Sequence, residues 1–183
     1  MSEISNKIDY WLSLGNEAID WYSIASNFCE DLAQKFNVEK EIVVGVLSAL
    51  SPLKKWDLNK KETIRFFEKN EVGHLPLQVA KVKAINRLRG QSNLDNKIIN
   101  ILAGNKTKAF YHNIMYPKSS HMVTIDTWMI RALDNPNKKS LTTKQYNNLA
   151  NQVIIKSHDI QLVPCQTQAI IWENIRKVYA TKG

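Results

Sequence analysis

The chain has 183 residues, 44% of them hydrophobic, which is enough for one domain or two small helical lobes with a proper core. Lys and Arg outnumber Asp and Glu by 25 to 17, and the net charge of +8 favours a polyanionic partner, although a basic protein without one would look the same. The two cysteines, Cys29 and Cys165, lie far apart and exclude an iron–sulfur cluster or a cysteine-rich zinc site.

Apolar residues recur at three- and four-residue steps along almost the whole chain, which is typical of amphipathic helices. Asn16 is a candidate N-cap for a helix that reaches Phe36. Residues 42–50 form a nearly continuous apolar run, whose length and small residues favour a central buried helix over a strand. Further helices are predicted at 58–68, 76–88, 95–102, 106–115, 127–133, 142–156 and 166–179. Only residues 122–125 look extended, so we expect a compact all-α fold.

Residues 102–109 read Leu-Ala-Gly-Asn-Lys-Thr-Lys-Ala and predict a helix, a glycine turn and a second helix. The free N–H groups and the positive dipole end of the second helix can hold a DNA phosphate without reading sequence. Lys106 and Lys108 strengthen the preference for an anion. The backbone contacts expected here come from Gly104, Asn105 and Thr107. Alternatively, Gly104 is an ordinary C-cap glycine between two helices.

Asp126 follows the apolar residues 122–125 and precedes Thr-Trp-Met-Ile-Arg, a pattern that predicts a helix N-cap. A carboxylate held at the wall of a cleft can stabilise an oxocarbenium-like sugar cation or take a proton from an attacking nucleophile. Capping alone would also explain this aspartate.

Three segments, taken in order, resemble the helix-hairpin-helix DNA glycosylases of the endonuclease III-like superfamily. Val-Leu-Ser-Ala-Leu at 46–50 is similar to the family's Leu-Leu-Ser-Ala-Gln, and the Gly104 turn is similar to its Leu-Pro-Gly-Val-Gly-Arg-Lys-Thr-Ala hairpin. Residues 125–131 match the family's Val-Asp-Thr-His-x-x-Arg at Asp, Thr and Arg, with Trp128 in place of His. The resemblance implies one such domain over residues 1–183, with a two-lobed fold, a hairpin at about 95–115, a catalytic segment at 122–133 and a cleft between the lobes.

The resemblance also implies catalytic roles. Asp126 matches the catalytic carboxylate, and Arg131 is expected to contact DNA. The catalytic lysine is Lys106 if the Gly-x-Lys-Thr string sets the register, or Lys108 if Gly104 matches the first family glycine; we prefer Lys106. The chain departs from the family in its single hairpin glycine, in lacking the cluster-binding cysteines, and in carrying Leu50 where relatives have glutamine.

Residues 51–59 form the expected base-binding loop. Trp56 would stack on an extruded base, and Asn59 would bond its edge. Lys54 and Lys55 would hold the flanking phosphates. The rest of the expected pocket consists of Ser48 and Trp128. Alternatively, Trp56 packs on the core and Asn59 is a polar surface residue.

The sequence therefore predicts a monomeric DNA glycosylase, with or without AP-lyase activity, that flips a damaged or modified base out of duplex DNA. We expect no metal and no cofactor. We also expect no membrane partner, because there is no run of about 18 apolar residues and no secretion signal. A cytoplasmic setting, beside the nucleoid, follows. Two alternatives remain open: a non-catalytic DNA-binding module, and a glycosylase-fold enzyme that acts on hypermodified pyrimidines.

Overall fold

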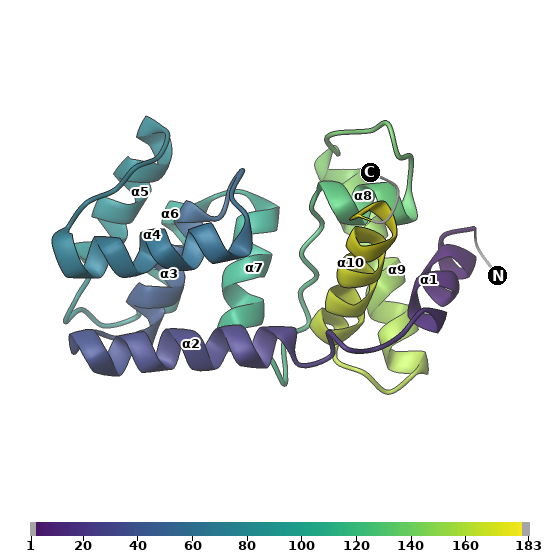
Figure 1. Ribbon diagram of the computed structural model, residues 1–183, viewed down its shortest axis with the longest axis horizontal. Coiled ribbons are helices and arrows are strands. Elements are labelled where there is room, and N and C mark those ends of the chain that lie inside the picture. Colours follow the sequence, from purple (N-terminus) through teal and green to yellow (C-terminus); the bar gives the residue numbers. More distant parts are fainter. Residues whose placement is uncertain (1–2, 181–183) are drawn as a thin grey trace. The chain divides into compact units, whose positions relative to one another are not determined.

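The computed structural model describes residues 3–180, and within that range it contains ten α-helices and no strand (Figure 1). The predicted all-α class is therefore confirmed. The helices are α1 (Glu3–Ser13), α2 (Trp21–Phe36), α3 (Lys40–Leu50), α4 (Trp56–Lys69), α5 (Pro76–Asn86), α6 (Leu94–Leu102), α7 (Asn105–Met115), α8 (Thr127–Leu133), α9 (Thr143–Asp159) and α10 (Pro164–Ala180).

The helices pack into two compact units. The central unit comprises Ala25–Met115, and the terminal unit comprises both ends of the chain, Met1–Ile24 and Tyr116–Gly183. Helix α2 starts in the terminal unit and continues into the central one. The cleft expected between two lobes stays a prediction.

The central unit is built around α3, which packs against α4, α5, α6 and α7. Every residue from Ile42 to Leu50 is buried, so the apolar run is a core helix, as predicted. Gly45 makes the close packing possible, since a Cβ there would lie 2.9 Å from Ile98 Cγ2 and 3.0 Å from Ile85 Cγ2. The glycine thus lets α5 and α6 approach the backbone of α3.

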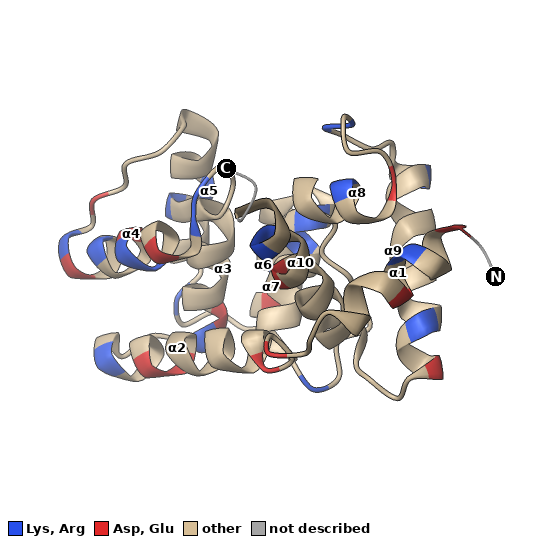
Figure 2. Ribbon diagram, turned by 45° about the vertical axis from the view of Figure 1, so that its right-hand side comes forward, with Lys and Arg blue, Asp and Glu red and all other residues tan. Residues whose placement is uncertain are grey.

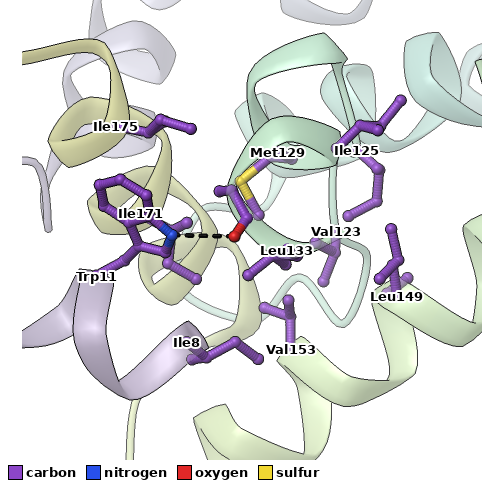
Figure 3. Packing of buried hydrophobic residues seen from close by; sticks show 13 residues of the cluster. Ile8, Trp11, Val123, Ile125, Met129, Leu133, Leu149, Val153, Ile171 and Ile175 are labelled. Carbon is purple, nitrogen blue, oxygen red and sulfur yellow. Dashed lines mark hydrogen bonds between the residues drawn. The ribbon is translucent and has the colours of Figure 1, made fainter. Parts of the chain in front are cut away.

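The terminal unit has its own core between α1, α8, α9 and α10 (Figure 3). Trp11 Nε1 donates to the carbonyl of Ala132 at 3.1 Å and joins α1 to α8. Around this bond pack the buried side chains of Ile8, Met129, Leu133, Leu149, Val153 and Ile171. Helix α1 was not predicted from the sequence, although its apolar residues at positions 4, 8, 11 and 12 have helical spacing.

One local expectation is corrected. Helix α2 begins at Trp21 and not directly after Asn16, whose carbonyl instead accepts the N–H of Ile19 at 3.0 Å in a separate turn. Residues 122–125, which looked extended in the sequence, lie outside the helices and pair with no strand. They follow an irregular path that Tyr146 holds, because its hydroxyl donates to Val123 O at 2.8 Å and accepts the N–H of Ile125 at 3.2 Å. Within residues 3–180, no helix combines the length and the apolarity that a membrane crossing requires.

Candidate functional site

The predicted turn between two helices is present and very short. Helix α6 ends at Leu102 and α7 begins at Asn105, so only Ala103 and Gly104 connect them. The left-handed backbone lies at Ala103 (φ 67°, ψ −66°) and not at the glycine. Gly104 N donates to Leu102 O at 3.0 Å, which closes a γ-turn, a strained conformation for an alanine.

Gly104 is the N-cap residue of α7, because its carbonyl accepts the N–H of Lys108 at 3.0 Å. A Cβ at this position would meet nothing within 4 Å, and φ is not positive. Neither the backbone conformation nor the packing of the turn therefore requires glycine. Without a side chain, Gly104 also cannot bond the first N–H groups of α7 as a serine or aspartate would.

Cations surround the turn. Lys81 Nζ donates to Leu102 O at 2.8 Å at the end of α6. Lys106 is exposed and Lys108 is half-buried, and neither amine makes an ion pair or a hydrogen bond within residues 3–180. Asn105 is exposed beside them, and the first turn of α7 contains no acidic residue. The start of α7 is thus an open, positively charged helix end.

Asp126 caps α8, as the sequence predicted. Its Oδ1 accepts the N–H of Met129 at 2.9 Å, and its Oδ2 accepts the indole N–H of Trp172 at 2.9 Å. The carboxylate is half-buried, and the approaching residues Val123 to Ile125 are buried. Two donors therefore fix its orientation.

Tyr146 lies close enough to Asp126 for their charges to interact. The pKa of Tyr146 is raised to about 12, mainly by burial; the hydrogen bond from the N–H of Ile125 opposes this rise, and the negative charge of Asp126 adds to it. The phenol stays neutral at physiological pH and acts as a bridge for the backbone before Asp126.

Trp128 and Arg131 lie on α8, the short helix that Asp126 caps. Trp128 is half-buried against the terminal core, and the Cζ of Arg131 lies 4.7 Å from its ring centroid. Arg131 is half-buried and makes no ion pair with a carboxylate in the described part of the chain. Figure 2 shows basic and acidic residues alternating along α4, whereas the only charged residue on α8 is basic.

The residues expected to line a base pocket lie in the central unit, apart from Trp128. Trp56 is the first residue of α4 and lies edge-on to Phe28 at 6.2 Å between centroids. Asn59 is only 2% exposed, and its Nδ2 donates to Leu47 O at 3.2 Å, which ties α4 to α3. Asn59 Oδ1 and Ser48 Oγ are buried and have no hydrogen-bond partner among the described residues. Their contacts with a base stay predictions.

The two lysines before α4 differ. The side chain of Lys54 is only 10% exposed, donates to Gly73 O at 3.1 Å and lies 3.6 Å from a carboxylate oxygen of Glu62. Lys54 therefore stabilises the loop between α3 and α4 through contacts within the protein. Lys55, at the N-cap of α4, is exposed and remains available to an anion.

Sequence reasoning missed two features. Leu53 is 91% exposed with a left-handed φ of 63°, and a hydrogen bond between a ring nitrogen of His74 and the carbonyl of Pro52 (3.0 Å) braces its turn. No sequence pattern marks it. Sequence reasoning also did not pair Trp172 with Asp126, since the two residues are 46 positions apart.

The site residues therefore fall into two sets. The terminal unit brings Asp126, Trp128 and Arg131 together at α8. The central unit contains the α7 start and, on α3, α4 and the loop between them, Ser48, Lys54, Lys55, Trp56 and Asn59.

A family model described as "Family of unknown function (DUF7178)" matches residues 15–178. The chain belongs to this family. No curated protein and no solved structure matches it. The DUF7178 match includes the turn before α7, the Asp126 cap and nearly all of α10.

Between residues 3 and 180, no three His, Cys, Asp or Glu side chains are grouped so that they could hold a metal ion. Cys29 and Cys165 are free and buried, and burial raises the pKa of their thiols to about 12 and about 11.

Proposed function

We propose that the chain is a DNA N-glycosylase that acts as a monomer on duplex DNA in the cytoplasm. The observation that carries the proposal is Gly104. Neither its φ nor its packing requires glycine, yet it occupies the N-cap of α7, where a side chain would stabilise the helix. The presence of glycine at this position is explained if a phosphate binds from the solvent close to the backbone of the turn.

Two amines support the same proposal. Lys106 and Lys108 directly follow the turn, and neither pairs with a carboxylate among the described residues. In the proposed reaction, one of these amines forms a bond to the sugar C1′ while the N-glycosidic bond breaks and its electron pair leaves with the base. Loss of a proton from nitrogen and opening of the sugar ring then give a Schiff base, from which β-elimination cleaves the strand.

Asp126 supplies the carboxylate in this proposal. It would accept the proton of the attacking amine or, if the lysines only bind phosphate, that of an attacking water, and it would stabilise positive charge on the sugar. Its fixed orientation between Met129 N and Trp172 Nε1 supports such a role, because a preorganised carboxylate needs no rearrangement during the reaction.

The test is a panel of duplex oligonucleotides that carry uracil, thymine mismatches, 8-oxoguanine, alkylated purines or hypermodified pyrimidines, scored for abasic product. Asp126→Asn should abolish release, whereas Asp134→Asn, the same change at the other end of α8, should not. Borohydride trapping of Lys106→Gln and Lys108→Gln assigns the nucleophile. Absence of product on the whole panel would reject the glycosylase.

A second candidate is a non-catalytic DNA-binding module. It is favoured by the fact that both oxygens of Asp126 already accept hydrogen bonds within the protein, as in a purely structural cap. For this module, DNA binding persists in Asp126→Asn and no abasic product forms on any substrate.

A further inference from the structure

Helix α10 presents a line of aromatic and cationic side chains on one face. Trp172, Arg176 and Tyr179 are spaced i, i+4 and i+7, so they follow one another along the helix over about 10 Å. Trp172 and Arg176 are half-buried, and Tyr179 is 41% exposed. The line is therefore accessible beside the terminal core.

Helix α8 extends this line. The Trp128 and Tyr179 rings meet edge to face at 5.6 Å, and the Cζ of Arg131 lies 4.7 Å from the first ring centroid and 6.0 Å from the second. At the other end, the Cζ of Arg176 lies 4.3 Å from the Trp172 centroid. We call these five residues, Trp128, Arg131, Trp172, Arg176 and Tyr179, the aromatic strip.

The guanidinium groups of the strip are weakly neutralised. Arg131 has no carboxylate partner in the described chain, and Asp134, one turn further along, pairs with Lys138 at 2.8 Å. Among the described residues, the carboxylate partner of Arg176 is Glu173, at 3.4 Å, and this pair lies at the partly exposed surface, where such pairs contribute little. A guanidinium stacked on a ring still has its N–H edge free for a phosphate.

We propose that the aromatic strip binds the unpaired nucleotides of single-stranded nucleic acid. Aromatic rings stack on bases whose faces are free, and the interleaved guanidinium groups contact the intervening phosphates. Duplex bases are stacked on each other and offer this strip only a backbone. An acidic peptide would satisfy the arginines but would leave the rings without partners. The proposal goes beyond the proposed glycosylase, because it requires neither a damaged base nor a reaction.

The test is a fluorescence-anisotropy titration of labelled, unmodified oligothymidylate with the full chain at several salt concentrations. Tyr179→Ala should weaken binding on the order of tenfold and leave the salt dependence unchanged, because it removes a stacking ring. Tyr179→Phe should restore the affinity. Arg131→Gln should lower the slope of log K against log salt by about 0.7, the value expected for one lost phosphate contact on a single strand.

Matched controls separate the strip from general charge. Lys177→Gln removes one positive charge from α10 at an exposed position paired with Glu17, and Tyr10→Ala removes an exposed tyrosine from α1. Both should bind as the unmodified chain does. The proposal is overturned if the chain does not bind oligothymidylate, if the controls weaken binding as much as the strip variants, or if oligoglutamate displaces the strand equally well. Because no base is released in this assay, its result is independent of the glycosylase test.

Discussion

The indole N–H of Trp172 donates to Oδ2 of Asp126 at 2.9 Å, while Oδ1 of the same carboxylate caps α8 through the N–H of Met129. One side chain thus ends the irregular segment before α8, starts that helix and fastens it to α10. A negative charge at a helix start is also favoured by the helix dipole. Any test of Asp126 in catalysis must therefore separate its chemistry from this structural role.

A double-mutant cycle makes that separation. An asparagine side chain would offer one acceptor oxygen to two donors, so Asp126→Asn should lower the unfolding free energy by about 1–3 kcal/mol. When Trp172→Phe has removed the second donor, the asparagine oxygen of Asp126→Asn can accept the N–H of Met129, and asparagine is a good N-cap. In that background, Asp126→Asn should lower the unfolding free energy by less than about 1 kcal/mol. Urea unfolding of the four proteins measures the coupling. Strictly additive costs would contradict the shared carboxylate.

Gly104→Ser should move stability and DNA affinity in opposite directions. A serine N-cap can accept an N–H from the first turn of α7, which should raise the unfolding free energy by a few tenths of a kcal/mol. Its side chain would also occupy the open space above the backbone, where the proposed phosphate binds. Thermal unfolding and binding to a duplex oligonucleotide measure the two effects. A variant that binds as tightly as the original chain would count against the phosphate contact.

Gly45→Ala should destabilise the central unit. The new Cβ would press on the Cγ2 atoms of Ile98 and Ile85, which belong to stiff β-branched side chains, and such overpacking costs about 1–3 kcal/mol. That loss exceeds the gain of up to about 1 kcal/mol from the better helix propensity of alanine. Gly73→Ala is the matched control, because its Cβ would meet only a carboxylate oxygen of Glu62 at 3.6 Å. Equal stability of both variants in urea would refute the close packing of α3.

Tyr146 should make stability depend on pH in the alkaline range. Its pKa is raised to about 12, mainly by burial, so between about pH 10 and 12 the folded chain retains a proton that the unfolded chain loses. The contribution of Tyr146 is complete below pH 10 and falls as pH rises, by up to about 2–3 kcal/mol.

Tyr146→Phe isolates this contribution from those of the cysteines. At pH 8 the variant should be less stable, because Val123 O and the N–H of Ile125 lose their partner. The difference in unfolding free energy between the unmodified chain and Tyr146→Phe, measured in urea, should then become smaller above pH 10. A difference that stays constant up to pH 12 would show that Tyr146 ionises normally.

The positions of most helices and the N-cap of α8 could be predicted from the sequence. Apolar spacing at three and four residues predicted α3 to α10 within a few positions, because helix formation depends on neighbours one turn apart. The Asp126 cap was equally predictable, since its acceptor and the N–H of Met129 lie three residues apart. The same spacing also marks α1, where it was overlooked.

Contacts between distant segments were decided only by the tertiary structure. Asp126 meets Trp172 across 46 residues, and the amide of Asn59 is buried against α3 although its sequence context suggested a polar loop. The strain at Ala103 likewise depends on how tightly α6 and α7 are joined. Hydrophobic periodicity indicates which face of a helix is buried but not which other helix covers that face. Many partners can bury the same apolar surface, and only the packing of the whole unit selects one of them.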